Sequence, residues 1–209
     1  MYLVLFCHGN SKANAFAREN VELRRRRKMS FDEGSRESDK AVCVWRICPI
    51  HLGHQKVLDA MIKKFGIKNC LLVIGSSNAP LTMRNFFSYV ERKGFVETIY
   101  PDLQVVPISD YPTDSEWLQA LDDILRFGGL SPKEVTFFGG CAEDIEFFLE
   151  VGRKHEIMNR FDGSTPKISA TEVRDALIQG RPLDGLLDPR IVDGVRGAFK
   201  GKCERFKKM

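Results

Sequence analysis

Two short stretches of the sequence carry side chains that suit a phosphate. The first places His51 and His54 where an apolar run ends and a helix is expected to begin. The second, far downstream, places Ser169, Thr171 and Arg174 at another expected helix start. Helix N-termini offer unpaired backbone N–H groups and a partial positive charge, and imidazole, hydroxyl and guanidinium groups add further donors. Together the two stretches predict a shared anion site of the kind that handles nucleotides.

Each of these residues also has a structural interpretation. Ser169 and Thr171 belong to the residue types that cap helices, and Arg174 would suit an ion pair one helical turn away. Cys48 precedes the two histidines at a spacing that suggests metal ligation, but a closed zinc site needs four ligands and the sequence supplies no partner cluster. A cation in the first turn of a helix opposes the helix dipole, which favours an anion beside Arg174.

Short apolar runs alternate with amphipathic segments from residue 40 onward, as is typical of buried parallel strands followed by helices. We expect strands at 41–47, 70–75, 103–108, 135–138 and 156–160. We expect helices at 52–65, 88–99, 115–127, 142–151, 171–179 and 189–199. This order predicts an α/β fold, a doubly wound, mostly parallel, Rossmann-like sheet with C-terminal helices.

In such a sheet, ligands bind at the carboxyl ends of the strands, near the point where the strand order reverses. Polar or small residues follow the first four predicted strands. We expect them along one edge of the sheet: His51 and His54, Gly75 and Ser76, Asp110, and Gly139 with Gly140. The glycines would serve equally well in turns alone.

The 209 residues suffice for one domain with a substantial core, which we place at 40–200, before a basic tail at 201–209. Residues 1–39 are polar, contain a basic run at 24–28 and are expected to form a mobile extension. The formal net charge of +4 is small, and basic and acidic residues are interspersed over most of the chain, so nucleic acid is not an expected partner. No apolar run approaches membrane-spanning length, and the six cysteines lack metal-finger spacing. We expect a cytoplasmic protein with no membrane partner, and a homo-oligomer stays open.

The motifs His-x-Gly-His and Ile-Ser-x-Thr-x-x-Arg resemble those of the HxGH superfamily of nucleotidyltransferases. From about residue 40 to 199 the chain is similar to nicotinamide-mononucleotide adenylyltransferases, in the form found in archaea and in bacterial proteins that also carry a Nudix hydrolase domain. The resemblance also includes Arg46, Gly75-Ser76-Ser77, the segment 84–92, Asp110 and Trp117. No Nudix box is present, so only the transferase half is implied.

The resemblance implies in-line attack by the phosphate of nicotinamide mononucleotide (NMN) on the α-phosphorus of ATP, with Mg²⁺ bridging the triphosphate. Because the attacking group is already an anion, the protein would mainly position two polyanions and neutralise charge. By position, the resemblance implies catalytic roles for His51, His54 and Arg174. It implies ATP contacts for these three and for Arg46, Gly139, Ser169 and Thr171. It implies acceptor contacts for Gly75, Ser76, Arg92, Asp110 and Trp117, whose indole would stack on the cationic pyridinium ring.

The chain departs from the family pattern at Trp45, where glycine is usual, at Phe86, where proline is common, and at Val90, where an acidic residue is frequent. A bulky Trp45 would crowd a nucleotide, and Trp117 would also serve as a core residue of its helix. Two alternatives therefore stay open: a related cytidylyl- or adenylyltransferase with another phosphorylated acceptor, and a non-catalytic nucleotide-binding protein.

Overall fold

The predicted alternation of strands and helices is confirmed over residues 40–158 and 168–206, which are the residues that the computed structural model describes. Side chains are described as far as Lys202. The predicted extension at 1–39, the basic run within it and the end of the predicted fifth strand lie outside the described residues. Those that are described belong to one compact unit.

Five parallel strands form the sheet, in the order β3-β2-β1-β4-β5. They are β1 Ala41–Trp45, β2 Cys70–Ile74, β3 Gln104–Pro107, β4 Thr136–Gly139 and β5 His155–Ile157. The chain first builds outward from β1 to β3 and then returns to place β4 on the other side of β1. The reversal of strand order therefore falls between β1 and β4, and the doubly wound prediction is confirmed.

Helices follow the strands: α2 Leu52–Phe65, α3 Tyr89–Ile99, α4 Asp114–Phe127, α5 Glu146–Glu150, α6 Ala170–Ile178 and α7 Pro189–Phe206, with a short 3₁₀ turn, η2, at Ile67–Asn69. The helix predicted at 142–151 is shorter than expected, because a hydrogen bond from the Gly140 N–H to the Asp144 carboxylate holds its first residues in a turn. The last helix continues past residue 199 into the predicted basic tail and ends at Phe206.

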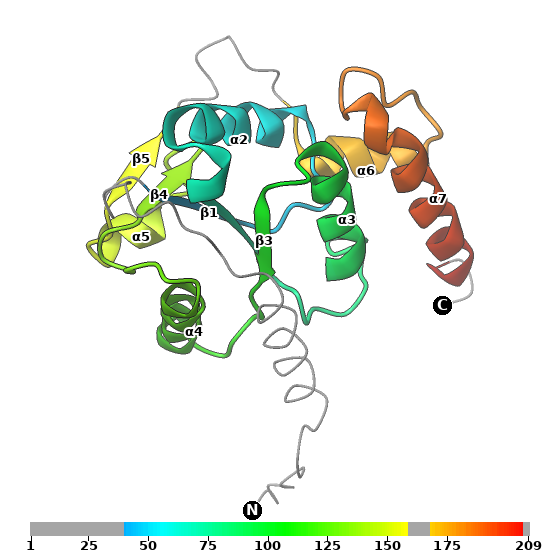
Figure 1. Ribbon diagram of the computed structural model, residues 1–209. Coiled ribbons are helices and arrows are strands. Elements are labelled where there is room, and N and C mark those ends of the chain that lie inside the picture. Colours follow the sequence, from blue (N-terminus) through cyan, green and yellow to red (C-terminus); the bar gives the residue numbers. More distant parts are fainter. Residues whose placement is uncertain (1–39, 159–167, 207–209) are drawn as a thin grey trace, which may run out of the picture. The chain divides into compact units, whose positions relative to one another are not determined.

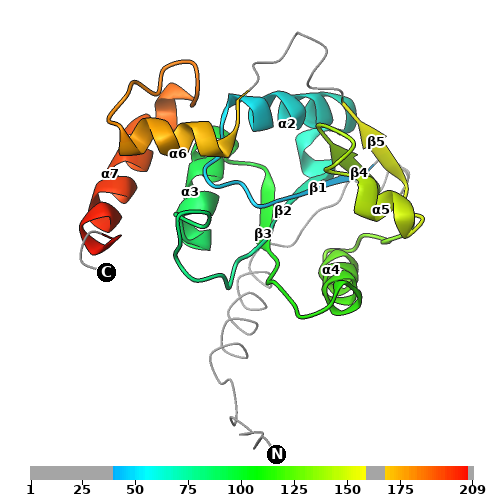
Figure 2. The ribbon, with the colours of Figure 1, turned by 180° about the vertical axis from the view of Figure 1, so that it is seen from behind.

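Helices cover both faces of the sheet, and α2 and α4 lie on opposite sides of it in both views (Figures 1 and 2). Alternate residues of β1 divide between two cores, because strand side chains point to opposite faces. Cys43 and Trp45 pack with α2, α3, α6 and α7, whereas Val42 packs with α4 and α5. The three central strands, β2, β1 and β4, are thus buried on both faces, as the strands of parallel sheets usually are.

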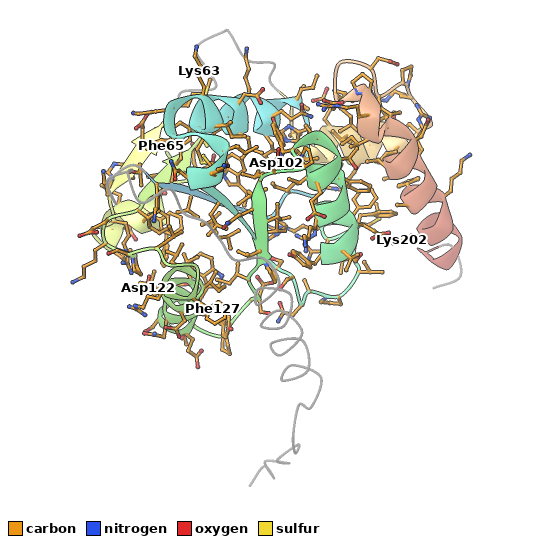
Figure 3. All side chains as sticks on the ribbon, in the orientation of Figure 1. Lys63, Phe65, Asp102, Asp122, Phe127 and Lys202 are labelled. Carbon is orange, nitrogen blue, oxygen red and sulfur yellow. The ribbon has the colours of Figure 1, made fainter. Side chains whose placement is uncertain are left out.

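Two capping boxes fix the starts of α3 and α4. Ser88 and Glu91 cap α3 reciprocally, and Thr113 and Glu116 do the same for α4. The carboxylate of Glu91 also pairs with Lys202 of α7, which lies beside α3 (Figure 3). This ion pair connects the C-terminal helix α7 to α3, which packs on the sheet.

Buried thiols contribute to the core rather than to chemistry. Burial raises the pKa of the Cys43 thiol well above its usual value and that of Cys70 to about 12. Both thiols therefore stay protonated at neutral pH and pack as small apolar groups, as their positions in apolar runs predicted.

None of the helices in residues 40–158 and 168–206 combines the length and the apolarity that crossing a membrane requires.

Candidate functional site

The two histidines of the first motif open helix α2 and hold each other in place. The His54 N–H donates to Nδ1 of His51, and the His51 N–H donates to Nδ1 of His54, both at 3.4 Å. The two rings stack with their centroids 3.7 Å apart. An Nδ1 that accepts a hydrogen bond puts the proton of a neutral imidazole on Nε2, the donor form that a phosphate oxygen accepts.

Gly53 of this motif makes room for the ring of His51, which is only 2% exposed. A Cβ at Gly53 would lie 3.0 Å from both Cε1 and Nδ1 of that ring, closer than side chains normally pack. It would also lie 3.6 Å from the carbonyl oxygen of Ile168, just before the second motif. The glycine of His-x-Gly-His is therefore required by the position of the first histidine.

Arg174 joins the second motif to the loop just before the first, across 126 positions of sequence. Its Nη1 donates to the Cys48 carbonyl oxygen at 3.0 Å, and its Nη2 donates to Thr171 Oγ1 at 2.9 Å. The predicted meeting of the two distant stretches is confirmed, and the start of α6 lies next to the start of α2 (Figure 1). The N-termini of two helices thus face one region at the carboxyl edge of β1.

The hydroxyl groups of the second motif have structural partners of their own. Ser169 is the N-cap of α6, and its Oγ accepts the Glu172 N–H at 3.1 Å. Thr171 Oγ1 accepts from Arg174. The capping alternative is therefore confirmed for Ser169. Thr171 instead accepts a hydrogen bond from Arg174. Because both oxygens act as acceptors, each hydroxyl proton can still be donated to a ligand.

A cavity of about 470 Å³ lies beside this anion site, at the carboxyl ends of β1, β2 and β3. It brings together five of the predicted residues: Arg46, Gly75, Ser76, Asp110 and Trp117. Sequence reasoning missed other lining residues, notably Tyr111, Asp114, Phe147 and Phe148. A signal was present for Asp114, because it stands three residues before Trp117 and so lies on the same face of α4.

A chain of polar contacts crosses the floor of this cavity. Arg46 Nε donates to Ser76 Oγ at 3.3 Å, and Ser76 Oγ donates to the Asp110 carboxylate at 2.9 Å. The three residues follow β1, β2 and β3, so neighbouring strand ends are linked through side chains. The contacts keep one cation and one anion at fixed places in the cavity wall.

Backbone strain is concentrated at the same edge. Ile47 has φ 45° and Ser76 has φ 52°, a left-handed conformation that residues with a side chain rarely adopt. Strained residues of this kind persist only where their surroundings hold them, and they cluster at functional sites. Ile47 follows Arg46 directly, and Ser76 carries one of the cavity hydroxyls.

Arg92, predicted to contact the acceptor, lies behind the site instead. It is 2% exposed, and its hydrogen bonds go to main-chain carbonyls rather than to the cavity. Nη1 donates to the carbonyls of Arg46 at 2.7 Å and Gly75 at 2.8 Å, and Nη2 donates to that of Ser76 at 2.9 Å. Burial lowers the pKa of this guanidinium, and the charge of Arg46 lowers it further. A phosphate would not reach Arg92, because helix α3 holds it against the strand ends.

The two tryptophans of the chain both line the cavity. Trp117 is partly buried, with its ring 5.6 Å from that of Phe147, so it belongs to a core cluster and to the cavity wall at once. Trp45 is 9% exposed and lies 5.4 Å from the ring of His54. The crowding of a nucleotide that we expected from Trp45 is limited, because most of its ring packs against the core and His54.

Two further sequence features have packing explanations. A Cβ at Gly139 would lie 2.5 Å from Cγ1 of Ile145, so this glycine is required by the packing of the segment before α5, and only its main chain could meet a nucleotide. Phe86 stacks on Phe199 of α7 at 4.8 Å, which accounts for its departure from the family pattern. Val90 is exposed on α3.

Comparisons with known proteins identify the family of the chain and relatives of similar fold. The family model described as cytidylyltransferase-like matches residues 49–176. The nicotinamide-nucleotide adenylyltransferase of Pyrococcus abyssi is 25% identical over 167 residues, covering 75% of this chain and 82% of that protein. The protein of the same name from Methanoculleus marisnigri is 24% identical over 157 residues, covering 73% of this chain and 88% of that protein.

Among solved structures, the fold matches that of a bifunctional NMN adenylyltransferase/ADP ribose pyrophosphatase from Francisella tularensis. The TM-score is 0.62 at 17% identity, over 73% of this chain and 46% of that chain. This chain therefore spans about half the length of the Francisella protein, and the likeness concerns the fold.

Proposed function

The chain belongs to the cytidylyltransferase-like family of nucleotidyltransferases, and from this premise we propose that it transfers the adenylyl group of ATP to nicotinamide mononucleotide, giving NAD and pyrophosphate. The observation that carries the proposal is an aromatic, acidic cavity directly beside a site where two helix N-termini converge. Trp45 connects the two, because it lines the cavity and contacts His54.

The triphosphate of ATP belongs, in this proposal, at the converging helix starts. His51 and His54 bind the α-phosphate through Nε2–H groups, and Arg174 binds the outer phosphates. Ser169 and Thr171 donate their hydroxyl protons, and Arg46 approaches from the cavity side. The arrangement is suited to polyanions because main-chain N–H groups, helix dipoles and cationic side chains point to one place.

The acceptor belongs in the cavity. Trp117 offers a flat face to the pyridinium ring, and a cationic ring gains from that contact. The carboxylates of Asp110 and Asp114 in the same wall complement the positive charge. They also favour the amide over the acid form of the mononucleotide, because the carboxylate of nicotinate would meet like charge in a partly desolvated site.

The reaction follows from this placement. An oxygen of the acceptor phosphate attacks the α-phosphorus of ATP, a new P–O bond forms, and the bond to the β-phosphate oxygen breaks in line. The electron pair of the broken bond leaves with pyrophosphate, so no protein nucleophile is needed. The protein lowers the barrier by holding the two phosphates together and by stabilising the charge on the five-coordinate phosphorus.

Mg²⁺ enters the proposal as part of the substrate, the MgATP complex. Within residues 40–158 and 168–206 no three His, Cys, Asp or Glu side chains form a group able to hold a metal ion. The donors at the anion site are instead imidazole N–H, guanidinium and hydroxyl groups, which bind phosphate rather than a hard cation. These donors would bind the triphosphate, and the triphosphate oxygens would coordinate Mg²⁺.

Incubation of the protein with MgATP and the mononucleotide tests the proposal. We expect stoichiometric NAD and pyrophosphate, with ATP preferred to CTP and the amide acceptor preferred to nicotinate mononucleotide. Phosphopantetheine and a phosphorylated alcohol serve as unrelated acceptors. Pyrophosphate release with one of these acceptors and none with the mononucleotide would refute the acceptor assignment while leaving the reaction class intact.

A further inference from the structure

Arg92 occupies an unusual position for a buried cation. Most buried arginines are neutralised by a carboxylate, as Arg153 is by Asp122 at 2.8 Å. The four hydrogen bonds of Arg92 go to carbonyl oxygens, those of Arg46, Gly75 and Ser76 and, at 3.4 Å, that of Ser88. Burying a charge without a hydrogen-bonded carboxylate is costly, and an apolar side chain would fill the same space at lower cost.

The carbonyls that Arg92 binds lie where the hydrogen-bonded ladder between β1 and β2 has ended. The last paired positions are Trp45 and Ile74, and one more bond, from the Gly75 N–H to the Trp45 carbonyl, spans 2.9 Å. Beyond it the two chains leave the sheet. The guanidinium supplies the donors that a next pair of residues would have supplied, and its planar fork reaches three carbonyls at fixed angles.

Two of these carbonyls belong to the strained part of the site. Ser76 is itself left-handed at φ 52°, and Arg46 directly precedes Ile47 at φ 45°. The side chains of Arg46 and Ser76 line the cavity and form the polar chain to Asp110. A small change in either main chain would move both side chains away from the ligand.

We propose that Arg92 is a positioning residue for adenylyl transfer: its buried guanidinium bridges the ends of β1 and β2 and thereby fixes the cavity-facing side chains of Arg46 and Ser76. It contacts neither substrate. The proposal rests on the proposed function for its substrates, and its geometry is independent of which mononucleotide binds.

The experiment compares Arg92→Lys and Arg92→Met with Arg153→Lys and Arg153→Met. Arg153 is a matched control, because its side chain is also nine-tenths buried, while its partner Asp122 lies on α4, on the opposite side of the sheet from α3 (Figure 3). All variants are measured at a temperature at which far-UV circular dichroism shows them folded, and urea unfolding gives the stability of each.

Three readouts follow. The near-UV circular dichroism and fluorescence of Trp45 and Trp117 report on the cavity without any ligand, because these are the two tryptophans of the chain and both line it. Fluorescence titration with NMN gives affinity, and steady-state kinetics separate KM from kcat. Lysine keeps charge and stem but cannot reach three carbonyls at once.

For Arg92→Lys we expect an altered near-UV spectrum, a raised KM for the mononucleotide and a fall in kcat/KM of about a hundredfold, as misplacement by about an ångström produces. Arg153→Lys should lose comparable stability and keep its affinity within about twofold, because distant sites act independently. Should the Arg92 variants match the Arg153 variants in spectrum and affinity, Arg92 has only a structural role.

The same conclusion holds if neither Arg92 variant folds under conditions where both Arg153 variants do. A wild-type protein that makes no NAD and binds no mononucleotide would contradict the proposed function instead, and the near-UV spectra would still decide whether Arg92 fixes the cavity wall.

Discussion

Single residues at the carboxyl edge of the sheet do two jobs at once. His51 caps α2 and belongs to the candidate anion site, Ser169 caps α6, and Arg174 connects the second motif to the loop that precedes the first. Trp117 packs in a core cluster and lines the cavity. The structural and functional interpretations of these residues are therefore not alternatives, because the hydrogen bonds that hold each side chain also orient it.

Trp117→Ala should raise KM for the mononucleotide by about tenfold or more, since loss of stacking on an aromatic face costs about 1–3 kcal/mol per ring. Its effect on KM for ATP should be small, because the triphosphate site lies beyond Trp45. Trp117→Phe, the matched control, should retain most of the affinity. An unchanged KM for the acceptor in Trp117→Ala would refute the stacking assignment.

Arg174→Lys should lower kcat/KM by about a hundredfold, because lysine cannot hold Cys48 and Thr171 and a phosphate together. The cost in stability should stay near 1 kcal/mol, the net value of one hydrogen bond. The control is Arg181→Lys, just after α6, where the guanidinium bonds Gln179 at the surface. Comparable kinetics for the two variants would remove Arg174 from the site.

Elements are held to one another by a few specific contacts. Glu91 caps α3 with Ser88 and pairs with Lys202 of α7. Burial, the largest influence, raises the pKa of Glu91, but the hydrogen bonds from Lys202 and Ser88 outweigh it and lower that pKa below its usual 4.5. A carboxyl with a lowered pKa stabilises the fold above its unfolded pKa, and this contribution is lost as the pH falls through the folded value.

Glu91→Gln should therefore cost about 1 kcal/mol of unfolding free energy at pH 7, and the difference from wild type should shrink as the pH falls below 4.5. Urea unfolding across a pH series measures it. Glu97→Gln provides the control, because Glu97 forms an exposed i,i+4 pair with Lys93 on the same helix. A difference that stays constant down to pH 3 would show that the ionised carboxylate does not matter.

At the scale of the whole molecule, the site joins parts that are far apart in the chain. In the proposed function, the loop after β1 and the start of α6 bind the triphosphate together, so only the folded protein should bind it. Ligands that bind the native state alone raise its stability by about 2.7 kcal/mol at a concentration of 100 times Kd.

MgATP should accordingly raise the melting temperature by about 5 °C or more under these conditions, given about 2–4 °C per kcal/mol for a chain of this size. NMN should do the same. Arg174→Lys should reduce the shift with MgATP, and Trp117→Ala the shift with NMN, as scanning fluorimetry or calorimetry would show. Equal losses for both ligands in both variants would contradict the division into two subsites.

The sequence by itself determined the order of elements, the parallel sheet and the edge that carries the polar residues. Hydrophobic period and helix-start chemistry are local properties, so α2 was predicted to its last residue and the starts of α3 and α6 to within one. The short α5 was overestimated, because the turn at Asp144 depends on a side-chain bond that apolar spacing does not reveal.

Only the tertiary structure decided what each polar residue faces. Arg92 and Arg174 were both expected to contact a substrate, yet Arg92 is buried against the strand ends and Arg174 connects the second motif to the loop after β1. Asp114 lines the cavity together with Trp117, which lies three residues further along α4. Burial and hydrogen-bond partners come from contacts between distant parts of the chain, and so the spacing of residues along the chain could not tell a buried arginine from one at the candidate anion site.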